Sequence, residues 1–288
     1  MTASPDDARV SEVSRRLRSR ADGILAAVWF MPEARTGFTE LGLSPEASSL
    51  GSRVAPLGRV PGAVAAALVA PMFPGRSSPA VDEAWRATDP ATLLAVRLRA
   101  AAAHLARVLG PEPTDVDRAV DLLRPVVEYA PTEGHPLYAG LRSLPWPGTP
   151  LGDLWRACDM VRERRGGSHL NAWVAAGLDP VELLLLTVQW RAKPNPGLAG
   201  PAEMGWPEAE AAAGRERLRA RSLLDGDDRI TDAGRRVRDE VELATDRQER
   251  PLVEALGDDV DELFELLAPW ARAVVSGADL PRPDGRGE

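Results

Sequence analysis

The sequence has very little cysteine, histidine and lysine, and the first two scarcities exclude classes of site. Cys158 is the only cysteine among 288 residues, so an intrachain disulfide is impossible and a cysteine-based zinc site lacks ligands. The histidines His104, His135 and His169 include no pair at the i, i+4 spacing of a helical metal site. We therefore predict no metal site; one could be assembled across the fold only from Glu133, His135 and His169. No cofactor is indicated.

Long apolar runs and a positive net charge are also missing. The formal charge is −8 and the isoelectric point is about 5.1, which argues against a protein that coats nucleic acid but leaves room for a local basic face. The longest apolar stretch, residues 60–73, is interrupted by prolines and a glycine and is too short to span a bilayer. Because the start of the chain is polar and acidic, unlike a signal peptide, we expect a cytoplasmic protein with no membrane partner.

What remains is an ordinary globular composition, with 44% hydrophobic and 27% charged residues. A chain of this length can bury about 75% of its unfolded surface and suits one or two domains. Arginine supplies almost all of the positive charge, since Lys193 is the only lysine. This bias is typical of a GC-rich bacterial genome and carries little functional information.

Apolar periodicity predicts a mainly α protein, because strand signals are nearly absent outside one C-terminal segment. Proline and glycine predict connections over residues 44–62, 131–150 and 194–205. Three parts are expected: a multi-helical, candidate ligand-binding region (9–177), a winged-helix element (178–250) and a C-terminal helix that packs back on the body (251–277). Helices are predicted over residues 9–30, 33–41, 63–70, 79–87, 90–109, 114–129, 150–165, 170–176, 179–191 and 258–275.

Residues 178–250 follow the order of a winged helix: support helix, connector, recognition helix, short hairpin and a further helix. The recognition helix is predicted over residues 207–222, with Pro207 well placed in its first turn. The wing is predicted as two short strands, 223–225 and 229–231, around a polar turn, before a helix that Asp232 caps. The expected fold is therefore mainly α with a C-terminal winged-helix (small α/β) element.

The predicted recognition helix and wing carry the candidate DNA-binding side chains. The same arginines have an alternative role, since cations near a helix C-terminus complement its dipole and the wing arginine can pair with Asp227 or Asp228. Glu208 and Glu210 occupy the end of the helix that would face DNA, where carboxylates are repelled by phosphates. The candidates are Arg215, Arg217, Arg219, Arg221 and Arg229.

A second candidate site lies around Gly166 and Gly167. We expect a helix to end at this glycine pair and a new one to begin at Ser168, so that free backbone N–H groups beside arginines would bind an anion. His169 could carry a proton there, and tryptophans could line an apolar cavity. The alternative is a plain helix–helix turn with a capping serine and solvated arginines. The candidate ligand-binding residues are Arg164, Arg165, Ser168, His169, Trp29 and Trp173.

Two family resemblances bear on function. Leu218, Leu223-Leu224, Asp228-Arg229 and Thr231-Asp232-Ala233-Gly234 resemble MarR-like winged-helix regulators. The whole chain resembles an actinobacterial family of helical proteins described as helix-turn-helix proteins. It does so through Trp29–Glu33, Arg53–Gly58, Leu144–Pro147, Arg164–His169 and Leu218–Thr231, although Gly167-Ser168 and Ser222 depart from the usual residues.

These resemblances imply a regulator-like protein that senses a small molecule and contacts DNA, for which a homodimer would be needed to read paired half-sites. The main alternative is a small-molecule-binding protein or enzyme whose winged element has no DNA role. A protein-interaction module is a third interpretation. Whether the chain catalyses a reaction stays open at this point.

Overall fold

A computed structural model describes residues 5–25, 31–191 and 200–276, and within these ranges the chain is built from helices. The mainly α prediction is therefore confirmed. The helices are α1 (Pro5–Leu25), α2 (Pro32–Glu40), α3 (Pro45–Val54), η1 (Ala55–Leu57), α4 (Gly62–Leu68), α5 (Pro74–Ala87), α6 (Pro90–Leu109), α7 (Val116–Tyr129), α8 (Pro136–Ser143), α9 (Pro150–Ala175), α10 (Pro180–Trp190), α11 (Glu208–Ala220), α12 (Asp232–Gln248), α13 (Arg250–Leu256), η2 (Gly257–Asp259) and α14 (Val260–Ser276).

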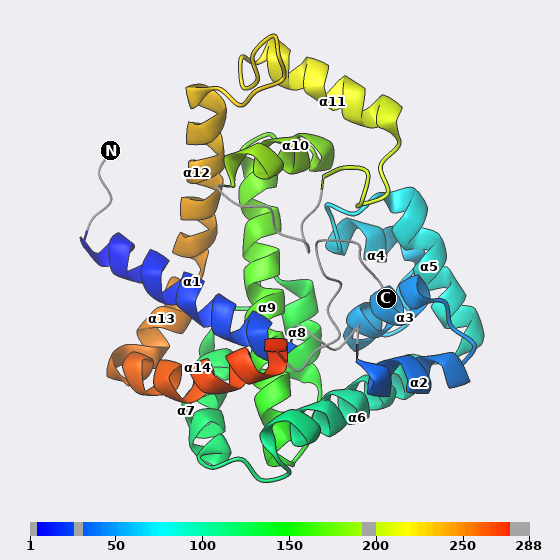
Figure 1. The fold of residues 1–288 in the computed structure, drawn as a ribbon, viewed down its shortest axis with the longest axis vertical. Coiled ribbons are helices and arrows are strands. Elements are labelled where there is room, and N and C mark those ends of the chain that lie inside the picture. The colour runs from blue at the N-terminus through cyan, green and yellow to red at the C-terminus, as the bar shows by residue number, and fades with distance from the viewer. Residues whose placement is uncertain (1–4, 26–30, 192–199, 277–288) are drawn as a thin grey trace.

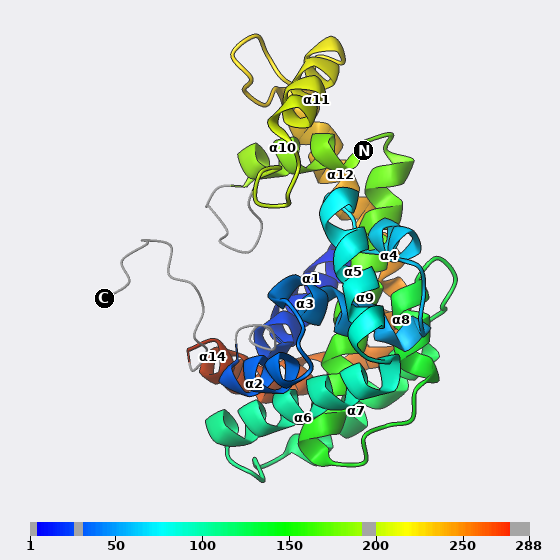
Figure 2. The ribbon, with the colours of Figure 1, turned by 90° about the vertical axis from the view of Figure 1, so that its right-hand side faces the viewer.

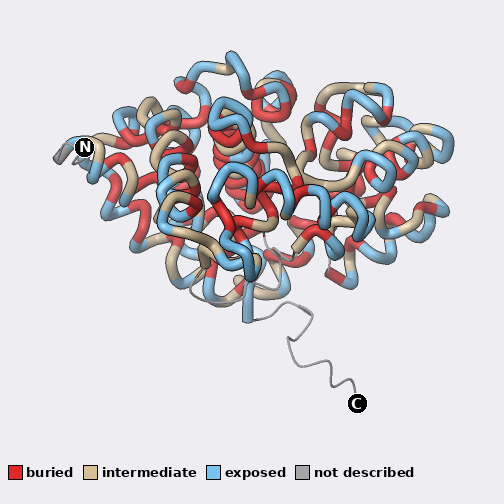
Figure 3. Tube along the Cα trace, turned by 90° about the horizontal axis from the view of Figure 1, so that it is seen from above, coloured by how far each residue is buried: buried red, intermediate tan, exposed pale blue. Residues whose placement is uncertain are grey.

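The long helix α9 runs through the middle of the molecule, and α1, α6, α7, α8 and α12 pack around it (Figure 1). Leu154, Cys158 and Ser168, spread along this helix, are fully buried. Because α9 is covered on nearly every side, it has no single apolar stripe. Burial along the centre of the molecule is also visible from above (Figure 3). The helix thus links the lower helical body to the upper end of the molecule.

The upper end is a smaller unit with its own apolar core. We call α10, α11, the turn 221–231 and the upper part of α12 the module (Figure 2). Trp173, at the end of α9, packs in its core with Leu186, Leu218 and Val241. In the body, α14 packs along α1, and α3 and α4 pack against α5. The module is therefore carried by two helices, α9 and α12, that continue into the body.

The predicted wing is wrong. Within the described ranges no strand forms, and the segment makes only one isolated antiparallel bridge, between Leu224 and Ile230. The Asp225 side chain accepts hydrogen bonds from the backbone N–H groups of Asp227 and Arg229, which closes the turn at once. Thr231 then caps α12. The turn closed by Asp225 and the cap formed by Thr231 leave too few residues for a pair of strands. The small α/β element is therefore absent.

The predicted break at Gly166 and Gly167 is also wrong, because α9 continues through both glycines to Ala175. Two glycines weaken an isolated helix by about 2 kcal/mol relative to alanine, but packing on α12 and on the loop before α8 outweighs this cost. Gly167 has a packing role, since a Cβ there would lie 2.9 Å from Cδ2 of His135. Ser168 is therefore inside a helix and exposes no free N–H group.

The two glycines should respond in opposite ways to alanine. Gly166→Ala is expected to raise the free energy of unfolding by about 0.5–1 kcal/mol, because the position is helical and an added Cβ meets nothing closer than 3.9 Å. Gly167→Ala should lower it, because the new methyl group would press on His135. Urea unfolding of both variants measures this. Loss of stability with Gly166→Ala would mean that the helix is interrupted there.

Candidate functional site

The corner between α9 and α10 has helix-turn-helix geometry. Four residues, 176–179, connect the two helices, which are bent by 105°, within the range of such motifs. Gly177 adopts a φ of 67° in the turn, and Asp179 and Glu182 form a capping box at the start of α10. However, Leu183, Leu186 and other α10 side chains are buried. Because α10 is covered, it cannot enter a DNA groove.

The exposed helix of the module is α11, at the outer end of the molecule (Figures 1 and 2). Leu218 is fully buried beneath it, and Gly214 allows a close approach to α10, since a Cβ there would lie 2.7 Å from Cγ1 of Val181. Its entry is held to the body by Trp206, whose Nε1 donates to the carbonyl of Pro71 at 2.8 Å. The helix is thus exposed on one face and fixed on the other.

Two of the five candidate DNA-binding arginines have structural roles. Arg217 and Arg221 both pair with Glu182, at 3.5 and 3.1 Å, and the carboxylate is only 4% exposed. Arg217 also bonds Asp179 at 2.5 Å, and Arg221 donates to the carbonyl of Gly177. These bonds close α11 onto the start of α10. Removal of either guanidinium would leave buried negative charge partly unpaired.

The other three arginines make exposed pairs. Arg215 pairs with Glu208, which is 77% exposed. Arg219 pairs with Glu216, which is 74% exposed, and with Asp228 at 2.6 Å. Exposed ion pairs contribute at most about 1 kcal/mol, so other anions can replace these partners. The last candidate is similarly free to move, because Arg229 in the turn is 76% exposed and lies 3.8 Å from Asp227.

The outward face of α11 carries small side chains where a recognition helix needs hydrogen-bonding groups. The alanines 209, 212, 213 and 220 are exposed there, beside Glu210 and Glu216. Reading of base edges in the major groove needs side chains such as arginine, asparagine or glutamine. An alanine offers only a methyl group for contact, and a carboxylate is repelled by the phosphates of DNA. This face therefore suits close approach of the helix to another surface rather than recognition of bases.

The second candidate site is a buried polar seam between α9 and α12, which we define by Arg165, Ser168 and His169 on α9 and their partners on α12. Arg165 pairs with Asp246 at 2.8 Å, and both side chains are almost fully buried. Asp246 also accepts hydrogen bonds from Ser14 and from Arg15 of α1, at 3.1 and 2.8 Å. A single carboxylate therefore ties three helices together.

His169 lies at the partly exposed end of the seam. Its Nδ1 lies 3.2 Å from Oγ1 of Thr245, and because that hydroxyl donates to the carbonyl of Val241, the histidine nitrogen is the donor. Burial, with Arg238 nearby, lowers the pKa of His169 to about 4 despite Glu242. Burial alone would raise the pKa of Glu242, but Arg238 and the other positive groups lower it to about 2. At neutral pH the imidazole is neutral and the carboxylate is ionised.

Ser168 lies deeper, in a chain of hydrogen bonds with His135 and Glu249. Its Oγ lies 2.9 Å from Nε2 of His135 and 2.5 Å from Oε1 of Glu249. Burial lowers the pKa of His135 and raises the pKa of Glu249. Ser168 donates to the carboxylate of Glu249, and Nδ1 of His135 donates to the carbonyl of Glu133 at 2.7 Å. Because Ser168 has no exposed surface, this serine–histidine contact is structural and not a hydrolytic site.

The remaining predicted ligand-binding residues do not join one pocket. Arg164 is buried and donates to the carbonyls of Pro131 and Gln248. Trp173 is 5% exposed, in the core of the module. Trp29 lies outside the described residues. His135 contacts Ser168, whereas His169 contacts Thr245, and the described part of the chain contains no cluster of three residues suited to a metal ion.

A small, shallow pocket lies beside the two glycines of α9. Arg53, Glu163 and His135 contribute its polar lining, and the Arg53–Glu163 ion pair closes one side at 2.8 Å. Burial opposes ionisation of Glu163, but Arg53 and Arg162 lower its pKa to about 2. Since the polar groups of the lining already pair with one another, the pocket offers a ligand few free donors.

Short sequence motifs do not reveal which residues form the seam. Arg238, Glu242 and Asp246 on α12, and Glu249 directly after it, were not predicted as site residues. Their spacing held a signal, because residues 238, 242, 245, 246 and 249 share one helical face. When one face of a helix in a large protein is exposed to solvent, the opposite face is usually buried. Polar residues on that opposite face therefore indicate packing against polar partners. From the sequence, this segment was predicted only as the helix that follows the wing.

The seam makes stability dependent on pH. The pKa of His169 falls from 6.5 to about 4 on folding, so its stabilising contribution is complete above pH 6.5 and is lost as the pH falls towards 4. Since the side chain is 30% exposed, we expect a loss of about 2 kcal/mol from this group. The difference in free energy of unfolding between wild type and His169→Gln should shrink by this amount from pH 7 to pH 4.5. A difference in free energy of unfolding that stays constant between pH 7 and pH 4.5 would contradict this role of His169.

The comparisons with known proteins agree with the geometry of the module. Residues 14–281 match the model of a helix-turn-helix family, so the chain belongs to that family. No curated protein and no solved structure matches the chain. No single helix in the described ranges is long and apolar enough to cross a bilayer, and the only helix pair that meets the criteria together, α9 with α10, is sharply bent.

Proposed function

We propose that this chain is a regulator of the helix-turn-helix type that contacts DNA with α11 and the adjoining turn 225–229. The observation that carries the proposal is the position of α11, an exposed helix at the outer end of the molecule that Leu218 and Gly214 fix to α10. Approach to a duplex requires a helix that protrudes and is rigidly held. The family membership points to the same class of protein.

The DNA contacts in this proposal go to phosphates. Arg215 and Arg219 lie one turn apart on α11, and Arg229 lies in the neighbouring turn. Their present partners are exposed carboxylates, so exchange for a phosphate costs little. Arg217 and Arg221 are not assigned to DNA, because they hold Glu182. Three phosphate contacts predict that the logarithm of affinity falls with the logarithm of salt concentration with a slope of about −2.7.

Recognition of sequence through base edges is not part of the proposal. The exposed alanines of α11 and the acidic residues Glu208 and Glu210 offer no donors for guanine or adenine. Any preference for particular DNA sequences would come from the shape of the duplex. Affinity should therefore be modest and similar among duplexes of equal length.

Other features belong to the same proposal. A small molecule would be sensed where the module joins the body, and a homodimer would place two modules on one duplex. The boundaries 9–177, 178–250 and 251–277, an actinobacterial origin and a cytoplasmic location remain predictions from the sequence.

Fluorescence anisotropy with a labelled duplex and the intact protein tests the proposal, between 50 and 200 mM salt. The double variant Arg215→Gln/Arg219→Gln should bind about tenfold more weakly and with a flatter salt slope. The matched control is Arg86→Gln/Arg272→Gln, which removes the same charge from exposed positions of the body and should bind as wild type does. Binding without salt dependence, or an equal loss in the control, would refute the proposal and favour a module without a DNA role.

A further inference from the structure

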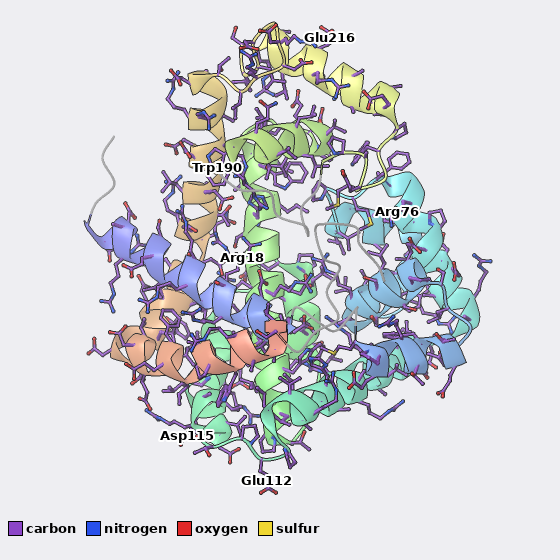
Figure 4. All side chains as sticks on the ribbon, in the orientation of Figure 1. Arg18, Arg76, Glu112, Asp115, Trp190 and Glu216 are labelled. Carbon is purple, nitrogen blue, oxygen red and sulfur yellow. The ribbon has the colours of Figure 1, made fainter. Side chains whose placement is uncertain are left out.

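Arginines from three elements meet at the partly exposed end of the seam, beside His169. They are Arg18 on α1, Arg191 at the C-terminal end of α10 and Arg238 on α12. Arg238 and His169 share Glu242, at 2.6 and 3.9 Å, and Arg238 lies 4.7 Å from the ring of Trp190, the residue before Arg191. Figure 4 shows Arg18 facing the interior near α9, with Trp190 above it.

Arg238 has an unused donor. Its side chain is 1% exposed, and its guanidinium lies 4.7 Å from the ring of Trp190. Nε donates to Thr187 at 2.9 Å and Nη2 to Glu242 at 2.6 Å, but Nη1 has no hydrogen-bond partner. A buried charged donor without an acceptor is costly. Native proteins keep such groups mainly where a ligand or water completes them.

Arg191 is the second donor without an acceptor, since its Nη1 is buried and also has no hydrogen-bond partner. Burial, followed by Arg18 and Arg238, lowers the pKa of Arg191, and Glu242 is the group that opposes this effect. The neighbourhood of Arg191 therefore contains more positive charge than the local carboxylates balance.

The nearby carboxylates are engaged elsewhere. Glu242 pairs with Arg238 and with Arg165, at 2.6 and 3.4 Å. Asp246 pairs with Arg165 and with Arg15, at 2.8 and 2.7 Å. On α1, Asp22 pairs with Arg18 in an exposed pair at 3.0 Å. Asp239 accepts from Nε1 of Trp190 at 2.7 Å. Among the described residues none of these contacts involves Arg191, so an added anion would meet a guanidinium without a carboxylate partner there.

This end of the seam is reachable from solvent. The side chain of Arg18 is 43% exposed and that of His169 is 30% exposed, and Arg191 is partly buried. Arg18 and His169 therefore form the exposed rim of this end of the seam. Because the imidazole of His169 is neutral, it neither repels the arginines nor competes with them for an anion.

We infer that this end of the seam binds the oxyanion group of a small molecule, a carboxylate or a phosphate. Arg191 and Arg238 are the donors, and Arg18 lies at the rim. Guanidinium groups suit either anion, because their planar N–H pairs match two oxygens. The predicted anion pocket at Ser168 is thereby replaced by one that uses side chains of α1, α10 and α12.

Because of its location, the site would let an anion regulate the position of the module. This part of the inference rests on the proposed function. Arg191 and Arg238 belong to the module, whereas Arg18 belongs to the body. An anion held between them would bridge the two parts and favour one position of the module over others. Binding of the anion itself does not depend on DNA, so a failed DNA experiment leaves the site untouched.

Inorganic phosphate and acetate, titrated separately into the intact protein at pH 7 and constant ionic strength, test the inference by NMR of the His169 ring. At least one of the two should give a saturable shift of this signal, and the better ligand identifies the preferred group. Arg191→Gln should weaken binding at least tenfold, and Arg18→Gln, at the exposed rim, about threefold. The charge-matched control Arg272→Gln, at an exposed position of α14 in the body, should bind as wild type does.

The inference would be overturned by either of two results. One is the absence of a saturable shift with both anions. The other is a shift that Arg191→Gln and Arg272→Gln reduce equally, which would indicate a general charge effect. Circular dichroism of each variant shows whether it is folded, and if Arg191→Gln is unfolded, the Arg18→Gln titration decides the question.

Discussion

Replacement of Asp246 with alanine is expected to lower the free energy of unfolding by about 3–5 kcal/mol, the largest effect of any single charge removal in the seam. Asp246 has no exposed surface and accepts from Ser14, Arg15 and Arg165. Its loss leaves the buried guanidinium of Arg165 with Glu242 alone, at 3.4 Å. The variant also removes the polar link between α1 and the α9–α12 pair, while the apolar packing of α1 stays in place.

Urea unfolding followed by circular dichroism measures this change. Asp227→Ala is a suitable control, since that side chain is 74% exposed and should cost less than about 0.5 kcal/mol. A similarly small effect of Asp246→Ala would show that the three helices are held together without this carboxylate, and the structural role of the seam would have to be abandoned.

Trp173→Ala is expected to lower the free energy of unfolding by about 3–5 kcal/mol, because it removes a large buried ring and leaves a cavity. Trp173 is 5% exposed and packs in the core of the module beside Leu186 and Leu218. From the sequence, Trp173 was a candidate either for lining a ligand cavity or for simple core packing, and its surroundings in the structure are apolar side chains of the module.

The neighbouring residue provides the control for this experiment. Val174 follows on the same helix but is 54% exposed, so Val174→Ala should change stability by less than about 0.5 kcal/mol. Thermal unfolding of both variants makes the comparison. Equal stabilities would mean that Trp173 is not a core residue and would return it to the list of ligand-binding candidates.

Much of the helical pattern could be predicted from the sequence, because apolar spacing and caps are local features. Residues 90–109 were predicted as a helix, and α6 has the same bounds. Its start was marked by Asp89, which caps the helix through Thr92. Helices α3 and α8 were missed, because prolines in segments 44–62 and 131–150 were taken as breakers. In the structure Pro45 and Pro136 occupy the first turn of each helix, where proline is favoured.

The candidate sites were predicted less well, because their chemistry depends on tertiary contacts. The arginines of α11 were identified, yet nothing local reveals that Glu182, far away on α10, binds Arg217 and Arg221. The glycine pair of α9 was taken as a turn, but packing around α9 keeps both residues helical. One local clue was sound: Ser222, noted as an unusual replacement for glycine, adopts a φ of 57° at the end of α11, where glycine is favoured.

The central claim is that α11 and the turn 225–229 form the DNA-contacting surface of this helix-turn-helix protein. Hydrogen–deuterium exchange of the intact chain, with and without a short duplex at low salt, tests it most directly. The account predicts slower exchange confined to residues 208–231, with no change in α6, α7 or α14. Unchanged exchange in residues 208–231, or protection in the body alone, would contradict it.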